Sequence, residues 1–435
     1  MSLLGAMNTA ISGLNGQSAA FSNISDNVAN SQTVGYKEVN TAFIDYLSVS
    51  NVTENQSGSV VTIPQYQNNV QGTLSQTSDP LGMAISGQGF FPVSSATSTA
   101  GGQTTFSTTP AYTRAGDFQL NAQGYLVNSA GNYLNGWPVN SQTNVVNTNS
   151  LAPIQVTQTI YNPVPTSTIS LSANLPATPS STTPVSSQVT VYDALGTPHT
   201  VTLNWTQNST NDWTASINAP DDISTPAEGT ADVQFGATSG NGVAAGTVGA
   251  LGTATGNVTT TSYAAGGAAN ISFTANFGQG PQQITLNLGN FGASTGLTQY
   301  AGSTYTLNGI SQDGVPPGSY SSITSAASGD ISVNYSNGQS RVIAQVPVVT
   351  FSSPDSLQSQ NGQAYTASNT SGNAIANAAG SNGAGSLVVG SIEQSNVDIA
   401  QQFSALIVAQ EAYSANTKVV TTADQLMQAT INMKQ

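Results

Sequence analysis

Apolar residues at both ends of the chain recur alternately every three and four positions, which is the heptad spacing of a packed α-helix. The N-terminal series predicts a helix over residues 1–30, and the C-terminal series predicts one over residues 391–435, a stretch without Gly or Pro. Ser395 or Asn396, ahead of Asp398, is expected to cap the second helix. The positions expected to pack are Leu4, Met7, Ile11, Leu14, Phe21 and Val28 in the first helix, and Ile399, Phe403, Leu406, Tyr413, Val420 and Met427 in the second.

Between these helices, short stretches rich in Val, Thr, Tyr and Phe alternate with Gly, Asn, Ser and Pro. This pattern is typical of strands joined by turns, and hairpins are expected at 118–127 and 189–205. The predicted fold is mainly β with α-helical termini. The family resemblance described below further implies that paired, coiled-coil-like terminal helices carry nested β-sandwich or barrel-like domains that are inserted in one another.

Residues 31–70 are expected to form a bent connection, because Gly35, Gly58 and Pro64 interrupt them and Gly72 follows. The family resemblance described below implies that this segment is also a contact between subunits. It implies the full division as well: an N-terminal helix (1–30), the connecting segment (31–70), a first β-domain in two parts (71–145 and 329–390), an outer region of one or two β-domains (146–328) and a C-terminal helix (391–435).

The apolar faces of the terminal helices can be covered in two ways, which are compatible with each other. The helices could pair within one chain as a stalk, or they could pair with helices of other copies. The heptad positions that flank the apolar ones carry almost no charge, so charge does not specify a partner.

Composition excludes several functions. Charged residues make up 6% of the 435 residues, against about 25% in an average protein. The net charge is −14, and no Lys or Arg lies between Arg114 and Arg341. Binding to nucleic acid or to an anionic membrane surface needs a basic patch that five basic residues cannot form. The absence of Cys excludes disulfides, thiolate metal sites and cysteine nucleophiles.

Two further sequence patterns bear on export and on membrane insertion. The first basic residue is Lys37, so the N-terminus lacks the cationic region of a cleavable signal peptide. No apolar run approaches the roughly 18 residues of a membrane-spanning helix, and we expect no membrane insertion.

Candidate catalytic groups are few. His199 is the single histidine, and an ordinary strand residue is the favoured interpretation. Residues 292–296 have the spacing of a nucleophile elbow, but no histidine follows them and no helix can begin there. A cluster of four acids lacks the alternating ligands of an EF-hand and indicates an acidic loop: Asp221, Asp222, Glu228 and Asp232. The chain is therefore predicted not to be an enzyme and to hold no metal or cofactor.

Five sequence blocks, in the same order, resemble the flagellar axial proteins of the rod and hook family. They include Ile11-Ser-Gly-Leu14, 84–91 and Ala409-Gln-Glu-Ala-Tyr413. The segment 191–199 and the length of the chain resemble the hook members more than the rod members. The motif residues that carry the resemblance are Asn27, Asn30, Gly35, Tyr36, Lys37, Arg114, Gly116, Phe118, Ser395, Asn396, Val397 and Asp398.

The resemblance implies a structural subunit of the flagellar hook. Such subunits assemble into a curved tube that acts as a universal joint, transmits torque from rod to filament and encloses the export channel. The terminal helices would form the inner tube. The implied partners are further copies, the flagellar rod and hook–filament junction proteins, the hook cap and the flagellar type III export apparatus.

The resemblance also implies export without a cleaved signal peptide and an extracellular location at the hook. Two alternatives remain at this point. One is a distal rod or hook–filament junction protein of the same family. The other is a secreted β-rich adhesin, which would need a signal peptide and a cluster of ligand-binding residues that the sequence lacks.

Overall fold

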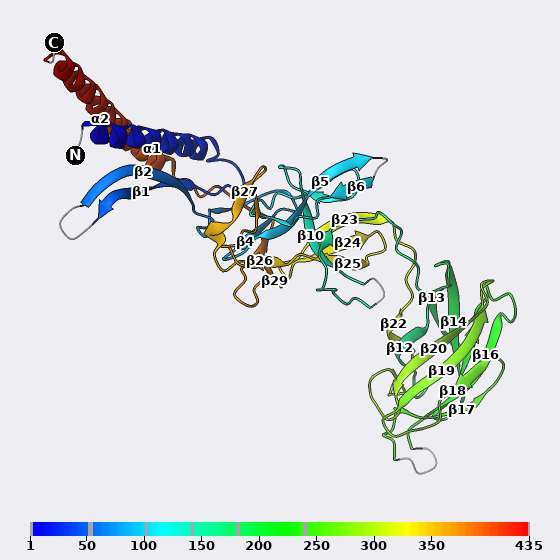
Figure 1. The fold of residues 1–435 in the computed structure, drawn as a ribbon. Coiled ribbons are helices and arrows are strands. Elements are labelled where there is room, and N and C mark those ends of the chain that lie inside the picture. The colour runs from blue at the N-terminus through cyan, green and yellow to red at the C-terminus, as the bar shows by residue number, and fades with distance from the viewer. Residues whose placement is uncertain are drawn as a thin grey trace. The chain divides into compact units, whose positions relative to one another are not determined.

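The computed structural model describes residues 3–50, 55–100, 103–140, 143–179, 183–237 and 242–433. Helix α1 (Leu3–Ala29) and helix α2 (Ile399–Asn432) lie at the two ends of the chain, and strands fill the sequence between them (Figure 1). The prediction of a mainly β protein with helical termini is confirmed. Neither helix in the described ranges has an apolar stretch long enough to cross a bilayer.

The chain divides into two compact units. The helix-bearing unit comprises residues 1–158, 321–334 and 340–435, and the all-β unit comprises residues 159–320 and 335–339. The predicted outer region, 146–328, is longer than the all-β unit at both ends. Residues 146–158 lie with the helix-bearing unit because Ile154 and Val156 donate backbone hydrogen bonds to Leu134 and Gly124.

A long hairpin, a larger sheet and several two-stranded sheets form the β part of the helix-bearing unit (Figure 1). The hairpin consists of β1 (Val39–Ser50) and β2 (Asn55–Tyr66). The larger sheet has the order β23-β24-β25-β10-β5-β7-β28-β27, with β6, β8, β9 and β11 paired to its members. Its strands are β5 (Phe91–Ala100), β6 (Gln103–Phe106), β7 (Ala111–Thr113), β8 (Gln119–Leu120), β9 (Leu126–Val127), β10 (Asn132–Pro138), β11 (Ala152–Pro153), β23 (Tyr320–Ser325), β24 (Asp330–Tyr335), β25 (Ser340–Gln345), β27 (Gln358–Gln360) and β28 (Ala364–Thr366).

The two-stranded sheets join early and late parts of the sequence. In two of these sheets, a strand that precedes the all-β unit pairs with a strand that follows it. In the third sheet, both strands follow the all-β unit. The pairs are β3 (Leu74–Gln76) with β31 (Ser391–Glu393), β4 (Met83–Ser86) with β30 (Ser386–Val389), and β26 (Val348–Thr350) with β29 (Ile375–Asn377); a short 3₁₀ helix covers Pro354–Ser356.

The all-β unit is a sandwich of two sheets. Buried and less buried residues alternate along its strands, as in β15 and β19, so each sheet has one inner face. The inner faces share one core that includes Trp205, Trp213 and Phe273. One sheet contains β13 (Val185–Tyr192), β14 (Pro198–Ser209), β15 (Asp212–Asn218), β16 (Ala227–Phe235) and β17 (Val248–Ala254); the other contains β12 (Thr168–Asn174), β18 (Val258–Thr260), β19 (Ala268–Asn276), β20 (Pro281–Asn290), β21 (Leu297–Thr298) and β22 (Thr306–Gln312).

Candidate assembly surface and buried junction

Helix α2 begins at Ile399, because Asp398 is its N-cap: Asp398 Oδ1 accepts hydrogen bonds from the backbone N–H groups of Ala400 (2.9 Å) and Gln401 (3.3 Å). The predicted start at residue 391 is wrong. Residues 391–393 form strand β31, which pairs with β3 and so cannot be helical. The expected cap at Ser395 or Asn396 is also wrong, since the Asn396 side chain accepts a hydrogen bond from the backbone N–H of Glu38 at 2.7 Å.

Helices α1 and α2 lie side by side (Figure 1). The α2 positions that are buried, half-buried or in contact with α1 are here called the seam, and they recur at heptad spacing in two columns. The predicted residues Leu406, Val420 and Met427 are half-buried, and the ring of the predicted residue Tyr413 contacts the ring of Phe21, with centroids 6.3 Å apart. The other column of the seam is Gln402, Ala409, Asn416 and Ala423, of which all but the half-buried Asn416 are buried.

Ile399 and Phe403 do not pack within the single chain, because both side chains are exposed, Phe403 at 52%; their predicted packing would have to be against other copies. Small side chains decide the register: a Cβ atom on Gly13 of α1 would lie 2.9 Å from Asn416 Nδ2. The helices approach closely at Gly13, where a larger side chain would collide with Asn416. A pattern based on large apolar residues does not detect such a contact.

Helix α1 is covered on two sides, by α2 and by the β1–β2 hairpin. Ser12 Oγ accepts a hydrogen bond from the backbone N–H of Val60 at 3.0 Å, and the Asn23 amide donates to Thr41 Oγ1 at 2.8 Å. Of the predicted packing positions, Met7, Leu14, Phe21 and Val28 are half-buried, whereas Leu4 and Ile11 are exposed. The buried positions of α1 are Ala10, Gly16, Ala20, Ile24 and Asn27.

A groove with a volume of about 570 Å³ lies between α1, β1 and α2. Its walls include Ile24, Phe43 and Val408, and Val408 is 66% exposed. A second hollow, of about 330 Å³, lies farther along the helix pair beside Val419 and Leu426. Apolar side chains in heptad spacing thus stay uncovered along one side of α2, which is typical of a surface that binds another chain.

A buried polar network joins the C-terminal end of α1 to the start of α2. The Asn27 amide donates to Gln402 Oε1 at 3.1 Å, and the Gln402 amide donates to Glu38 Oε1 at 2.9 Å. Tyr36 donates its hydroxyl hydrogen to Asn27 Oδ1 at 3.1 Å. Burial, together with the carboxylates of Asp26 and Glu38, raises the pKa of Tyr36 to about 12, so the phenol stays protonated and remains a donor.

Next to this network lies a buried ionic triad made of Lys37, Arg114 and Glu393. Glu393 Oε1 lies 2.5 Å from Lys37 Nζ, and Glu393 Oε2 lies 3.0 Å from Arg114 Nη1; all three side chains are at most 2% exposed. Burial lowers the pKa of Lys37 and of Arg114, and in each case Glu393 opposes this shift. The triad carries one excess positive charge.

Backbone groups complete the triad. Lys37 Nζ donates to the carbonyl of Val70 at 2.6 Å, Arg114 Nη2 donates to the carbonyl of Gly87 at 2.7 Å, and the Gly72 N–H donates to Glu393 Oε1 at 2.8 Å. Segments from the first third and from the end of the sequence therefore meet here. Hereafter "the junction" means the triad together with the Asn27–Gln402 network.

Most of the family-motif residues surround the junction. Gly35 has φ +71° and lies against the backbone of Arg114, while Phe118 is buried against Phe91. Asn30 donates from its amide to the carbonyl of Asp26, Ser395 Oγ accepts from the backbone N–H of Val397, and Val397 is half-buried. Three further residues of the junction, Glu38, Glu393 and Gln402, were not predicted as site residues. Gln394, Ser395 and Asn396 follow Glu393, so no local signal marks it as a buried acid.

A substitution at Gly116 tests how closely the chain at this residue packs against the backbone of Met83. A Cβ atom there would lie 1.6 Å from the carbonyl oxygen of Met83, which is a clash with backbone and not with a movable side chain. Gly116→Ala is expected to lower the free energy of unfolding by about 3 kcal/mol, measured by urea denaturation. As a control, Gly131→Ala has the cost of a left-handed conformation, about 1–2 kcal/mol, because nothing lies within 4 Å of the added carbon. Equal losses in the two variants would contradict the clash.

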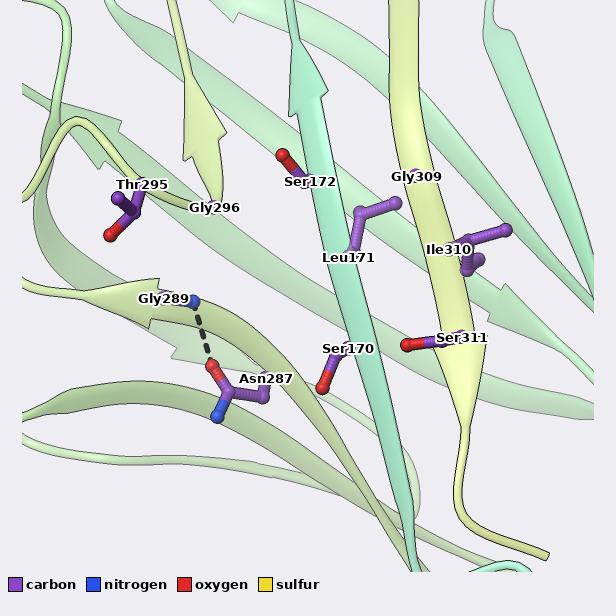
Figure 2. A pocket seen from close by; sticks show the side chains of 10 residues that line it. All are labelled: Ser170, Leu171, Ser172, Asn287, Gly289, Thr295, Gly296, Gly309, Ile310 and Ser311. Carbon is purple, nitrogen blue, oxygen red and sulfur yellow. Dashed lines mark hydrogen bonds between the residues drawn. The ribbon is translucent and has the colours of Figure 1, made fainter.

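The described residues contain no group of three His, Asp or Glu side chains placed to hold a metal. A hollow of about 390 Å³ in the all-β unit is lined by hydroxyl and amide groups from β12, β20 and β22, including Ser170, Ser172 and Ser311 (Figure 2). Its lining includes no titratable side chain, and the Asn287 oxygen accepts a hydrogen bond from the Gly289 N–H at 2.7 Å. Residues 292–296 lie in the loop between β20 and β21, and β21 follows them instead of a helix.

Comparison with family models gives matches along most of the chain. Residues 7–37 match "Flagella basal body rod protein", and residues 84–174 match "Flagellar hook protein FlgE/F/G D1 domain". Residues 162–315 match "Flagellar basal body protein FlaE D2 domain", and residues 388–433 match "Flagellar basal body rod FlgEFG protein C-terminal".

Individual proteins are similar over the full length. The flagellar hook protein FlgE of Brucella abortus is 31% identical over 440 residues, covering 100% of both chains. The FlgE of Salmonella typhimurium is 28% identical over 442 residues, covering 98% of this chain and 99% of the relative. The crystal structure of the Helicobacter pylori flagellar hook protein FlgE2 matches with a TM-score of 0.47 at 14% identity, over 72% of this chain and 98% of that one.

Proposed function

Since the chain belongs to the flagellar hook protein FlgE family and is a structural subunit of the hook, we propose that it self-assembles into a curved tube that transmits torque from rod to filament. In this proposal α1 and α2 form the inner wall around an export channel. The observation that carries it is the uncovered apolar surface of the paired helices. Its exposed members are Leu4, Ile11, Ile399, Phe403, Ile407, Val408, Val419, Leu426, Ile431 and Met433.

The β1–β2 hairpin, within the connecting segment 31–70, is proposed as a second contact. Ile44 pairs with Val61 and Ala42 pairs with Ile63, so these side chains share one face of the hairpin. Phe43 and Thr62 lie on the other face, next to Gly16 of α1. The face with Ile44, Val61 and Ile63 is thus turned away from α1 and stays exposed. Two different apolar surfaces on one subunit favour head-to-tail contacts, which produce helical polymers.

The scarcity of charge supports the role of a joint. A bending tube needs contacts that exchange partners as subunits slide, and neutral hydrogen bonds contribute only about 0.5–1.5 kcal/mol each. Charged pairs are stronger and would hold one register. With 6% charged residues, the chain offers mostly Ser, Thr, Asn and Gln for such contacts.

The proposal extends to the partners and the route of export. Rod and hook–filament junction proteins would contact the ends of the tube, the hook cap would cover its growing end, and the type III export apparatus would deliver the subunit. Export without cleavage is consistent with the packing of α1 against α2, because removal of the N-terminal segment would destroy this contact.

Electron microscopy of the purified chain under polymerising conditions tests the proposal. The comparison variant lacks residues 1–29 and 399–435 but keeps Glu393, so it removes both helices and leaves the triad intact. Curved tubes from the full chain alone are the expected result. Tubes from both would contradict the role of the helices, monomers from both would contradict self-assembly, and short straight tubes would favour a distal rod protein.

A further inference from the structure

Helix α1 carries an apolar stripe that neither α2 nor the hairpin covers completely. Its members recur every three or four positions, and they are here called the heptad stripe of α1: Leu4, Met7, Ile11, Leu14 and Phe21. Leu4 is 57% and Ile11 is 40% exposed, and the other three are half-buried. The stripe therefore keeps apolar surface that can be covered by another chain.

The contacts of α1 within the chain lie on its other faces. Gly13 lies against Asn416 of α2, and Ser12 bonds to Val60 of the hairpin. With 3.6 residues per turn, Gly13 lies roughly 160° and Ser12 roughly 100° around the helix from Ile11. The centre of the heptad stripe thus faces away from both internal partners of α1.

Helix α2 carries a second apolar stripe beside the seam. From Ala405 to Ala429 its members recur every three or four positions, and they include Val408, Val419 and Leu426, which are 66%, 46% and 54% exposed. The two hollows along the helix pair coincide with it, because Ala405 and Val408 line the groove of about 570 Å³, and Val419 and Leu426 line the hollow of about 330 Å³. This set is here called the free stripe of α2.

The two stripes are complementary in charge and in size. Neither contains a charged residue, and no charged residue is among those that line the larger groove. The free stripe places Ala405, Ala412 and Ala415 among its larger members, which leaves room for side chains of a partner. The heptad stripe of α1 supplies Leu, Met, Ile and Phe, the kind of knob that such holes accept.

The stripes also match in length. At 1.5 Å per residue, Leu4 to Phe21 spans about 26 Å along α1, and Val408 to Leu426 spans about 27 Å along α2. Within one chain the two stripes cannot meet, because α1 already contacts α2 through other faces of both helices. The occupant that fits the free stripe is therefore α1 of a second copy.

We propose that the heptad stripe of α1 in one subunit packs into the free stripe of α2 in the next subunit. This pairing rests on the proposed self-assembly and names the two faces that meet in it. Because the faces differ, the contact is head-to-tail and does not close on itself in a dimer, so it can repeat along a helical polymer. It selects its partner by the fit of large side chains between small ones, and apolar character alone is not sufficient.

The double substitution Ala405→Leu with Ala415→Leu tests the fit. Both positions are exposed in the single chain, and Leu forms helices almost as well as Ala, so the monomer should stay folded. The added side chains would exclude those of the next α1. The critical concentration for tube formation, measured by sedimentation, should therefore rise about tenfold.

The matched control is Ser414→Leu with Gln425→Leu, which adds the same two side chains to another exposed face of α2. Its critical concentration should equal that of the unmodified chain. A surface that is only adhesive would assemble more readily with extra leucines in the free stripe. A critical concentration that Ala405→Leu with Ala415→Leu lowers or leaves unchanged would thus overturn the pairing.

Cross-linking identifies the partner directly, because the chain contains no Cys and each introduced thiol is unique. Chains with Ile11→Cys are mixed with ¹⁵N-labelled chains that carry Cys in place of Val408, Ala415, Val419 or Leu426, one position at a time. The mixtures are assembled into tubes and treated with a short bismaleimide linker. Mass spectrometry should then find labelled chains joined to unlabelled ones for at least one position of the free stripe.

Thr417→Cys, on the opposite side of α2, is the control and should not be joined to Ile11→Cys above the level in unassembled chains. Tubes in which the control is joined and the free stripe is not would overturn the pairing and leave self-assembly intact. So would links only between two Val419→Cys chains, since α2 would then pair with α2. An unmodified chain that forms no tubes at all would contradict the proposed function, and the pairing with it.

Discussion

Glu393→Gln is expected to lower the free energy of unfolding of the helix-bearing unit by about 3–5 kcal/mol. The substitution keeps the shape of the side chain but leaves Lys37 and Arg114 buried together without a counter-charge, and a broken buried ion pair costs this much. Urea denaturation followed by circular dichroism measures the loss. This is the largest effect on stability that we expect from one substitution in this chain.

Lys37→Met is the informative comparison. Because the triad has an excess positive charge, removal of Lys37 leaves a balanced pair of Arg114 and Glu393, and the loss should be smaller than in Glu393→Gln. Asp45→Asn, at an exposed position of the hairpin, should change stability by no more than about 0.5 kcal/mol. If Glu393→Gln is as mild as Asp45→Asn, the triad does not stabilise the junction.

The pair of substitutions Val408→Asp and Leu426→Asp is expected to abolish tube formation and to leave the monomer folded. These side chains are 66% and 54% exposed in the single chain, so a charge there costs the monomer little. In a polymer that covers this side of α2, the same carboxylates would be buried without partners. Sedimentation gives the polymerised fraction, and thermal denaturation gives the stability of the monomer.

The matched control keeps both positions apolar. Val408→Ile with Leu426→Met preserves the surface and should form tubes like the unmodified chain. Tubes from the aspartate variant at the normal rate would place the assembly surface elsewhere, for example on the hairpin alone.

The heptad analysis did not separate the positions that pack within the chain from those that stay exposed. Leu406, Val420 and Met427 lie on the seam, while Ile399 and Phe403 are exposed in the single chain. Hydrophobicity ranks Phe403 above Ala409 as a packing residue, yet close approach of two helices selects the smaller side chain. The large residues of the other column remain free for contacts between subunits.

The junction could not be derived from local patterns. Lys37 and Glu393 are 356 positions apart in the sequence, and Arg114 and Glu393 are 279 apart. Periodicity and capping signals act over a few residues and carry no information on which distant charges meet. For the same reason Ser391–Glu393 was assigned to a helix: nothing nearby indicates that β3 pairs with it.

The predicted boundaries of the outer region differ from those of the all-β unit for a related reason. Strand β12 pairs in parallel with β20, so the chain between them forms the other sheet before it returns. The sequence predicted individual hairpins well, as at β13–β14, because their turns are local. The positions at which the chain enters and leaves the all-β unit depend on pairings between distant strands.

The ionic triad also sets an order of events for a chain that emerges with its N-terminus first. In such a chain Lys37 and Arg114 would emerge early, whereas Glu393, the one carboxylate that pairs with both among the described residues, follows the whole all-β unit in the sequence. Until then the helix-bearing unit lacks its counter-charge, strand β31 and helix α2. The all-β unit can close as soon as its own segment is released. We therefore expect the all-β unit of a subunit to fold first. Its assembly surface should form only when the whole chain has emerged.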